Sequence, residues 1–421
     1  MHIYMAGVGG VGIGPLAEIA NGAGYKVSGS DLSVSQTTHE LAVNGINVII
    51  YPQDGSRMRE LHETQPIDWF VYTSALPAGH PELVLAHELG IRTSKRDELL
   101  ETIIRERRLK LIAVAGTHGK TTTTGMLVWA FLQLGVPISY SVGTTLSFGP
   151  AGLYDEASEY FVYECDEYDR NFLAFHPDVT LITTLDHDHF DTYPTLEDYV
   201  GAFQQFAFQS GSVTTWSDIV ETLGTASNIS SLSETASEIT LSGEHNRRNA
   251  SLALTVLTRL LSASRSELAE ALNSFPGTNR RFENLAENLY TDYGHHPIEI
   301  AATLQLASEL GKRVVLVYQP HQNGRQHEVR DEYTPEVFRH ADHVYWLPTY
   351  LTRENEGQSI LTPQELALSI AEKTTYPELD DALWRMIESE RANGALVLCM
   401  GAGPIDGWIR EKATGSTTGA R

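Results

Sequence analysis

The stretch VAGTHGKTTTT, residues 114–124, constrains the fold more than any other part of the sequence. It follows the apolar run LKLIA (109–113) and precedes the apolar run GMLVWAFLQL (125–134). A glycine-bounded turn between a buried strand and a helix points successive backbone N–H groups into one concavity, at the positive end of the helix. The pattern therefore predicts an α/β fold with an anion-binding turn at this position.

The chain has 421 residues, which suggests about three domains at roughly 150 residues each. Three segments alternate short apolar strands with helical patterns, as in parallel sheets covered by helices. We expect three α/β domains, at residues 1–106, 107–276 and 277–421. Helices are predicted at 36–44 and 81–89, and the tail ATGSTTGAR (413–421) is expected to be disordered.

The composition limits the partners. The net charge is −24, with 54 acidic against 30 basic residues, and this argues against nucleic-acid or anionic-membrane binding. No apolar run approaches the ~20 residues that cross a bilayer, and the two cysteines, Cys165 and Cys399, have no metal-type spacing. We expect a cytoplasmic protein without membrane insertion. Its affinity for phosphates must come from backbone N–H groups, a few placed cations and metal ions.

The turn at 116–122 can supply backbone N–H groups, a cation and a ligand for a metal ion. Gly116 and Gly119 allow the tight curl, Lys120 offers a cation to the β- and γ-phosphates, and Thr121 offers a hydroxyl to Mg²⁺. Because Val114 stands where the strict P-loop pattern has glycine, this is a shortened variant. We predict ATP and Mg²⁺ binding, with these nucleotide contacts: Gly116, Thr117, His118, Gly119, Lys120, Thr121 and Thr122.

Two acidic stretches follow predicted strands: ECDEYD (164–169) and DHDHFD (186–191). The carboxyl ends of parallel strands border one crevice. Carboxylates there would help to hold Mg²⁺, and an imidazole could reach a second ion. The alternative is that each stretch is a solvated loop.

The first strand leads into Gly7-x-Gly9-x-x-Gly12, with Asp31 at the end of the second strand. This matches the dinucleotide fingerprint and raises the hypothesis of an NAD-dependent oxidoreductase. However, such a turn binds a diphosphate whatever nucleoside is attached, so a UDP-sugar fits equally well. A phosphate turn elsewhere in the chain is hard to explain in a simple dehydrogenase.

Four stretches together resemble the Mur ligases of peptidoglycan synthesis. They are AGTHGKTTT (115–123), GEHNRRNA (243–250), RRFE (280–283) with DYGHHPIEI (292–300), and YQPHQNGR (318–325). They cover nearly the whole chain in the family's order, and the likeness is greatest to members that join L-alanine to UDP-N-acetylmuramate. The resemblance implies a Rossmann-like N-terminal domain for the UDP-sugar, a P-loop ATPase-like central domain that is unusually short here, and a Rossmann-like C-terminal domain for the amino acid.

The activity that the resemblance implies is ATP-dependent amide ligation. ATP phosphorylates the lactyl carboxylate of UDP-N-acetylmuramate to an acyl phosphate, and the amine of a small amino acid, expected to be L-alanine, attacks it. The expected partners are these two substrates, with the chain a monomer or a homodimer.

The resemblance also carries roles to residues. It assigns metal ligation to Thr121, Glu164 and His189. It assigns catalytic roles to Lys120, Glu164, His189, Arg281, His295 and Arg325. Nucleotide contacts are expected from Asn246 and Asn249 (adenine), Arg281 (phosphates) and Asp292 (ribose). Substrate contacts are expected from Gly9, Gly10, Gly12, Asp31, Tyr293, His296, His321 and Arg325. Simpler interpretations stay open: Asn246 as a helix cap, and His295 with His296 as a structural pair.

The sequence departs from the family at Gln322, where alanine ligases usually carry arginine, although Arg325 keeps a second one. Since a guanidinium is the best clamp for an amino-acid carboxylate, alanine, glycine and serine all remain open. No lysine lies between Lys120 and Lys312, so the central domain has no carbamylated lysine of the kind that some Mur ligases use.

Two further alternatives remain. A recycling ligase that attaches a murein tripeptide would share the chemistry, and the acidic run at 166–169 resembles it. An inactive regulatory homologue is the other, although Lys120, Thr121, Glu164 and His189 are intact.

Overall fold

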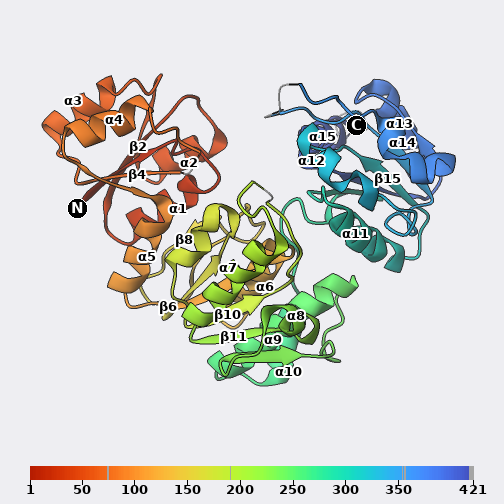
Figure 1. The fold of residues 1–421 in the computed structure, drawn as a ribbon, viewed down its shortest axis with the longest axis horizontal. Coiled ribbons are helices and arrows are strands. Elements are labelled where there is room, and N and C mark those ends of the chain that lie inside the picture. Colours follow the sequence, from red (N-terminus) through yellow and green to blue (C-terminus); the bar gives the residue numbers. More distant parts are fainter. Residues whose placement is uncertain (74, 190, 353, 355–356, 417–421) are drawn as a thin grey trace. The chain divides into compact units, whose positions relative to one another are not determined.

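Three separate sheets organise the chain. The computed structural model describes residues 1–73, 75–189, 191–352, 354 and 357–416. The chain divides into two compact units: Met1–Ile239 with Asn249–Pro276, and Thr240–Arg248 with Gly277–Arg421. The first unit carries two sheets and the second carries one (Figure 1). The predicted three-domain α/β fold is confirmed.

The N-terminal sheet is parallel, in the order β3-β2-β1-β4-β5. Its strands are β1 (His2–Ala6), β2 (Lys26–Asp31), β3 (Asn47–Ile50), β4 (Trp69–Tyr72) and β5 (Arg92–Lys95). The helices are α1 (Ile13–Gly22), α2 (Gln36–Val43), α3 (Ser56–Thr64), α4 (Pro81–Glu88) and α5 (Arg96–Glu106). Every residue of β1 is buried, because this central strand has a neighbour on either side and helices over its faces. The helices predicted at 36–44 and 81–89 are α2 and α4.

The central sheet has the order β12-β11-β10-β6-β9-β7-β8 and is parallel except for the β7–β8 pair. Its strands are β6 (Lys110–Ala115), β7 (Ser139–Ser141), β8 (Gly152–Leu153), β9 (Tyr160–Glu164), β10 (Val179–Ile182), β11 (Ser212–Trp216) and β12 (Ile229–Leu232). The helices are α6 (Lys120–Gln133), the 3₁₀ helix η1 (Tyr168–Ala174), α7 (Leu196–Gln209), α8 (Ser217–Leu223), α9 (Glu244–Leu260) and α10 (Arg265–Asn273). β6 lies between β9 and β10, so the phosphate turn is flanked by the ends of both.

The C-terminal sheet has the order β13-β14-β18-β15-β16-β17, and only its β13–β14 pair is antiparallel. Its strands are β13 (Glu283–Ala286), β14 (Leu289–Asp292), β15 (Val314–Tyr318), β16 (His343–Trp346), β17 (Thr374–Thr375) and β18 (Leu396–Met400). The helices are α11 (Pro297–Glu309), α12 (Asn323–Val329), η2 (Arg330–Glu332), α13 (Pro363–Leu366), η3 (Leu368–Lys373), α14 (Asp381–Ala392) and α15 (Ile405–Ser416). The prediction of a disordered tail is wrong for residues 413–416, which continue α15; its remainder, 417–421, lies outside the described residues.

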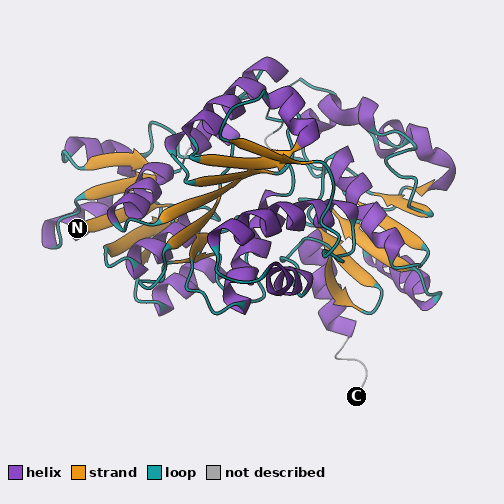
Figure 2. Cartoon of the chain, turned by 90° about the horizontal axis from the view of Figure 1, so that it is seen from below, coloured by secondary structure: helices purple, strands orange, loops and turns teal. Residues whose placement is uncertain are grey.

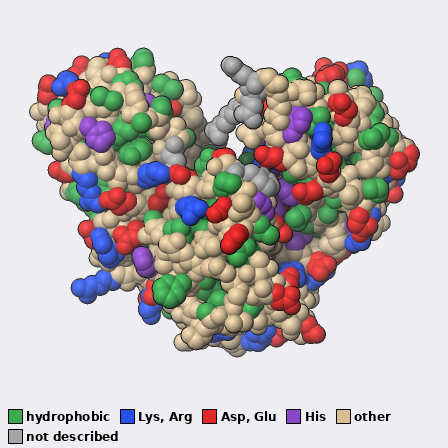
Figure 3. All heavy atoms as spheres, viewed as in Figure 1, with side chains coloured by type: hydrophobic (Ala, Val, Ile, Leu, Met, Phe, Trp, Pro, Cys, Tyr) green, Lys and Arg blue, Asp and Glu red, His purple; other side chains and the backbone are tan. Residues whose placement is uncertain are grey.

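Helices flank the strands of the sheets (Figure 2). In the C-terminal domain they enclose an aromatic core around Trp346, which contacts the rings of Tyr318, Tyr333 and Phe338. Acidic and basic side chains are interspersed over the face shown in Figure 3. Within the described part of the chain, the helices are too short or too polar to cross a bilayer.

Candidate active site

The phosphate turn joins β6 to α6. Gly116 and Gly119 have φ values of 129° and 83°, which disfavour any side chain. A Cβ on Gly116 would lie 2.8 Å from the carbonyl oxygen of Thr184, and one on Gly119 would lie 3.0 Å from the amide of Asn249. Glycine is therefore required at both positions by conformation and by space.

Residues after β10 hold this turn in place. The Thr117 hydroxyl donates to the carbonyl of Asp186 (2.7 Å), and the backbone N–H of His118 donates to the Thr184 hydroxyl (2.9 Å). The turn is thus fixed by the neighbouring strand, as a preformed anion site requires.

Lys120 begins α6 and turns back over the turn. Its ammonium group donates to the carbonyls of Gly116 (2.6 Å) and Thr117 (3.1 Å) and to the Glu167 carboxylate (3.0 Å). Burial acts to lower the pKa of Lys120, but the negative charges of Glu167 and Asp166 outweigh it and leave the pKa raised. Lys120 is therefore a cation at neutral pH beside the turn, and its contact with the β- and γ-phosphates stays a prediction.

Thr121 and Glu164, two of the three predicted metal ligands, lie together. The Thr121 hydroxyl donates to one oxygen of Glu164 (2.8 Å), and the backbone N–H of Gly143 donates to the other (2.6 Å). Glu164 is the last residue of β9, which pairs with β6, so the carboxylate comes to the start of α6 through sheet geometry. A hydroxyl and a carboxylate are hard oxygen donors that suit Mg²⁺.

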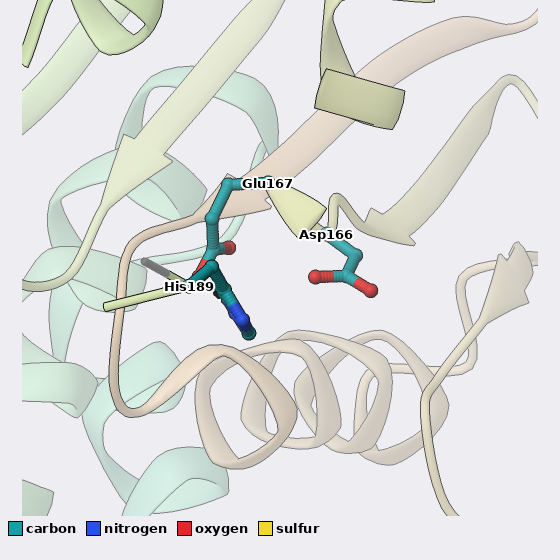
Figure 4. Close-up of side chains that lie close together, drawn as sticks. All are labelled: Asp166, Glu167 and His189. Atoms are coloured by element: carbon teal, nitrogen blue, oxygen red, sulfur yellow. Dashed lines mark ion pairs between the residues drawn. The ribbon is translucent and has the colours of Figure 1, made fainter. Parts of the chain in front are cut away.

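The third predicted ligand, His189, lies in a second cluster with Asp166 and Glu167 (Figure 4). One potential ligand atom from each of the three lies within 4.8 Å of the others, and His189 Nε2 is 3.5 Å from Glu167. Burial acts to lower the pKa of His189, but its contact with Glu167 and the charge of Asp188 raise it overall.

The backbone around this cluster is strained. His189, Asp169 and Arg170 have φ values of 58°, 52° and 56°, which non-glycine residues rarely adopt. Strain of this kind persists where the surroundings hold a residue for a function. Lys95, at the end of β5, forms an ion pair with Asp169 (2.5 Å), so it contacts the segment that follows Asp166 and Glu167.

The two asparagines of the GEHNRRNA motif have different surroundings. Asn249 is buried against Gly119, beside the phosphate turn. The Asn246 side chain donates to the carbonyl of Ser242 (3.0 Å) at the start of α9, so it makes a helix-end contact here. The adenine roles of both stay predictions.

Predicted residues of the second unit gather around Glu299 in the first turn of α11. The carboxylate of Glu299 lies 3.6 Å from both Arg281 Nη1 and His295 Nδ1. The rings of His295 and His321 are 6.4 Å apart, and the Arg281 guanidinium lies 5.3 Å from the Tyr293 ring. Burial lowers the pKa of His295 to about 4, despite Glu299, so this imidazole is neutral at pH 7.

Asp292 and His296 have structural partners in the same region. The Asp292 carboxylate accepts backbone N–H bonds from Phe282 and Gly294 (2.7 Å each), and burial raises its pKa to about 6. His296 caps α11, where its ring accepts from the backbone N–H of Ile298 (3.4 Å). Arg325 lies on α12, close enough for its charge to act on His295.

In the N-terminal domain, Gly9, Gly10 and Gly12 form the turn from β1 to α1. The backbone N–H of Gly9 donates to Asp31 (2.8 Å), and a Cβ on Gly9 would lie 2.9 Å from the same carboxylate. Asp31 therefore shapes the turn itself.

The sequence predicts Glu167 only as one of several carboxylates of the run 164–169 that could help to hold Mg²⁺, and it gives no role to Glu299, which follows the histidine pair by three residues. The structure places these two carboxylates at the centres of the two clusters. Only a knowledge of spatial neighbours separates them from other acidic residues.

Family models match along most of the chain. The matches are "Mur ligase family, catalytic domain" at residues 2–108, "Mur ligase middle domain" at 114–213 and "Mur ligase, glutamate ligase domain" at 280–403. Among curated proteins, the UDP-N-acetylmuramate–L-alanine ligase of Coxiella burnetii is 31% identical, with 96% of each chain covered. That of Lachnospira eligens is 32% identical, again with 96% of each chain covered.

Solved structures show the same fold. The UDP-N-acetylmuramate-alanine ligase of Thermotoga maritima matches with a TM-score of 0.75 at 22% identity, with 100% of both chains covered. A murein peptide ligase of Psychrobacter arcticus matches with a TM-score of 0.65 at 22% identity, with 99% of both chains covered. With three family models in order and relatives above 30% identity over almost its full length, this chain belongs to the Mur ligase family.

Proposed function

We propose that this chain is an ATP-dependent ligase that joins L-alanine to the lactyl carboxylate of UDP-N-acetylmuramate, in the synthesis of peptidoglycan precursors. The observation that carries the proposal is the 31–32% identity, over 96% of the chain, to ligases named for these two substrates. The phosphate turn and its neighbouring carboxylates support it, because they supply the parts that phosphoryl transfer needs.

A carboxylate becomes reactive toward an amine only when one of its oxygens is made a leaving group. Transfer of the γ-phosphoryl group of ATP to the lactyl carboxylate gives an acyl phosphate and ADP. The amine of the amino acid attacks the acyl carbon, and the tetrahedral intermediate collapses to the amide and phosphate. We assign Lys120, whose ammonium group contacts the phosphate turn, to neutralise charge on the transferring group, and we assign the same role to Arg281.

Thr121 and Glu164 are the proposed ligands of Mg²⁺, with His189 serving a second ion beside Asp166 and Glu167. Their oxygen-rich chemistry fits that metal. Bound Mg²⁺ would supply positive charge that stabilises the negative charge of the transferring phosphoryl group. The chain's own part is to place Lys120 and these ligands on preformed elements, so that little has to move when the nucleotide binds.

On the second unit, we assign the amino acid to the region of Tyr293, His295, His321 and Arg325, and the ATP ribose to Asp292. Because His295 is neutral at pH 7, it does not pair as a cation with the carboxylate, and it can accept a hydrogen bond from the amino group, which attacks as the free amine. Arg325 is the proposed carboxylate partner. The high net negative charge and interspersed surface charges favour small-molecule partners over nucleic acid.

The test is phosphate release from ATP and Mg²⁺ with UDP-N-acetylmuramate, with L-alanine, glycine, L-serine or murein tripeptide added in separate reactions. Release driven by L-alanine is expected. Release driven by the tripeptide alone would make the chain a recycling ligase, and silence in every reaction while ATP still binds would make it an inactive homologue. A rise in melting temperature with NADH but not with UDP would indicate an oxidoreductase instead.

A further inference from the structure

The N-terminal sheet has one position where a ligand crevice is expected. In the order β3-β2-β1-β4-β5, the direction of chain progression reverses between β1 and β4. In open parallel sheets, ligands bind at the carboxyl ends of the strands at such a switch point. The glycine turn after β1 opens onto this crevice and leads into α1.

Arg96 reaches this turn from the edge of the sheet. It is the first residue of α5 and follows β5 directly, yet its guanidinium lies against Gly12, which precedes α1. The three atoms nearest to the position of a Cβ on Gly12 all belong to Arg96: Nη1, which such a Cβ would overlap, Cζ at 3.3 Å and Cδ at 3.7 Å. The absence of a side chain at residue 12 therefore makes room for the arginine.

The guanidinium of Arg96 is largely removed from water, and its donors are little used. The side chain is 25% exposed, and its Nε lies 3.3 Å from the buried carboxylate of Asp97. Neither Nη atom donates a hydrogen bond to any residue that the structure describes. An arginine with a purely structural role usually donates hydrogen bonds from both Nη atoms to protein groups, because unpaired buried donors cost free energy.

The guanidinium of Arg96 is a positive charge in an acidic region of the protein. In a chain of net charge −24, Arg96 lies near the carboxylates of Asp97 and Asp166, so it is held as a cation. A guanidinium fork matches the paired oxygens of a phosphate better than an ammonium does. Within the turn, the N–H groups of Gly9 and Gly10 already donate to Asp31 and to the carbonyl of Gly7. The start of α1 and the two Nη atoms of Arg96 therefore supply the positive surface at the crevice.

We propose that Arg96 binds the diphosphate of the nucleotide sugar, with its Nη atoms donating to phosphate oxygens that rest on the glycine turn. This rests on the proposed function, which supplies the nucleotide sugar. Glycine is then required at residue 12 for substrate binding, since a side chain there would displace the guanidinium of Arg96. The lactyl carboxylate, the other anion of the same substrate, is the competing partner for Arg96.

Equilibrium binding of UDP tests this, because UDP carries the diphosphate and no lactyl group. In Arg96→Met, the Kd for UDP should rise about 10- to 100-fold, which corresponds to the loss of one or two charge-assisted hydrogen bonds. Arg96→Lys should give a smaller rise, because it keeps the charge and loses the fork. The Kd for ATP with Mg²⁺ should stay unchanged in both variants.

Arg92→Met is the matched control. Arg92 lies on β5, stacks at 3.5 Å over the Trp69 ring and pairs with Glu98 (2.6 Å) at the surface, so its loss removes the same charge only four residues from Arg96. It should leave UDP binding unchanged. Circular dichroism and ATP binding report whether Arg96→Met folds, and Arg96→Lys gives the answer if it does not.

The outcomes separate the two proposals. Wild-type protein that binds UDP while both Arg96 variants bind it equally well would overturn the role of Arg96 alone. Normal UDP affinity with weakened binding of UDP-N-acetylmuramate would reassign Arg96 to the lactyl carboxylate and overturn the diphosphate contact. Wild-type protein that binds neither ligand would overturn the proposed function together with this inference.

Discussion

The carboxylate of Glu167 lies 2.9 Å from the ammonium nitrogen of Lys120, and the Glu167 side chain has no exposed surface. The same carboxylate is 3.5 Å from His189, and the Tyr193 hydroxyl holds the Glu167 backbone carbonyl (2.6 Å). One buried acid therefore connects the lysine of the phosphate turn to the histidine of the predicted metal cluster. Burial acts to raise the pKa of Glu167, but Lys120 and His189 outweigh it and leave the pKa lowered.

Glu167→Gln should therefore damage both stability and turnover. A buried ion pair that loses one partner typically costs about 3–5 kcal/mol, because the other charge stays buried. We expect Glu167→Gln and Lys120→Met each to lower the free energy of unfolding in urea, and each to abolish phosphate release. The double variant should be more stable than the sum of the two losses predicts, since no uncompensated charge remains.

Glu197→Gln, at an exposed position in the first turn of α7, controls for the change of charge. Strictly additive losses in the Glu167–Lys120 cycle would show that the two charges do not stabilise each other. An active Lys120→Met protein would overturn the site assignment as a whole.

The local parts of this site were predictable from the sequence and the long-range parts were not. The strand, turn and helix around Lys120 follow from the apolar runs and the two glycines, because these patterns act over a few residues. The Glu167–Lys120 pair joins residues 47 apart, and it depends on β9 lying beside β6. No periodicity encodes that neighbour.

His296 shows that a local sequence motif can also leave the role of a residue undecided. Its motif fits a substrate contact, yet the ring caps α11 in a reciprocal arrangement with Glu299, whose carboxylate accepts from the His296 backbone N–H (3.3 Å). Sequence patterns do not separate the two roles, because a cap and a ligand contact both use a polar side chain before a helix. Likewise, nothing in the sequence connects Arg96 to Gly12, 84 positions away.

The buried imidazole of His295 should make the folded protein less stable at acidic pH. Its pKa is about 4 in the folded protein, against 6.5 for an unperturbed imidazole, because burial disfavours the charged form. A lowered folded-state pKa contributes stability that is present above pH 6.5 and is lost as the pH falls toward 4. The loss from this group reaches about 3 kcal/mol at pH 4. His295→Gln should flatten the decline of the unfolding free energy between these limits, measured in urea at a series of pH values.

His245 acts in the same direction, since burial lowers its pKa to about 4 as well, so His295→Gln should remove only part of the decline. His39→Gln, at an exposed position, is the control. A variant with the same pH dependence as the wild type would mean that His295 is accessible to protons in the folded chain.

Gln322→Arg should strengthen binding of the amino acid. Gln322 immediately precedes α12, with a φ of 61°, and Arg325 lies in the first turn of that helix, three residues further along the chain. A second guanidinium near the proposed carboxylate position should lower KM for L-alanine about 10-fold or more, since a hydrogen bond to a charged group contributes about 1.5–3 kcal/mol. Steady-state kinetics with L-alanine, glycine and L-serine measure this.

The gain should be similar for the three amino acids, because all carry the same carboxylate. Gln36→Arg, on the exposed face of α2, controls for the added charge. An unchanged KM would place the carboxylate away from this turn, and a gain for one amino acid alone would point to side-chain selection instead.

The hydroxyl groups of Tyr318 and Tyr333 have fewer protons than hydrogen-bonding contacts. The Tyr318 hydroxyl contacts the His295 carbonyl (3.2 Å) and the Tyr333 hydroxyl (3.0 Å), and Tyr333 also contacts Oε1 of Gln326 (2.7 Å). The Gln326 amide donates to the carbonyl of His321 (3.0 Å), which fixes its orientation. Two hydroxyl protons cannot fill three hydrogen bonds, so one contact always lacks a proton.

Tyr333→Phe should leave the Tyr318 hydroxyl with one contact and remove the hydrogen-bond donor of Gln326. The Tyr318 proton then goes to His295, while Oε1 of the fully buried Gln326 loses its donor, an expected loss of about 1–3 kcal/mol in unfolding free energy. Because Gln326 holds the His321 carbonyl, KM for the amino acid should rise while the Kd for UDP stays unchanged. Tyr290→Phe, whose ring stacks on Phe282 at 4.5 Å, is the control in the same unit. A Tyr333→Phe protein with wild-type stability and KM would show that the hydrogen-bond network does not hold the backbone of His321 in place.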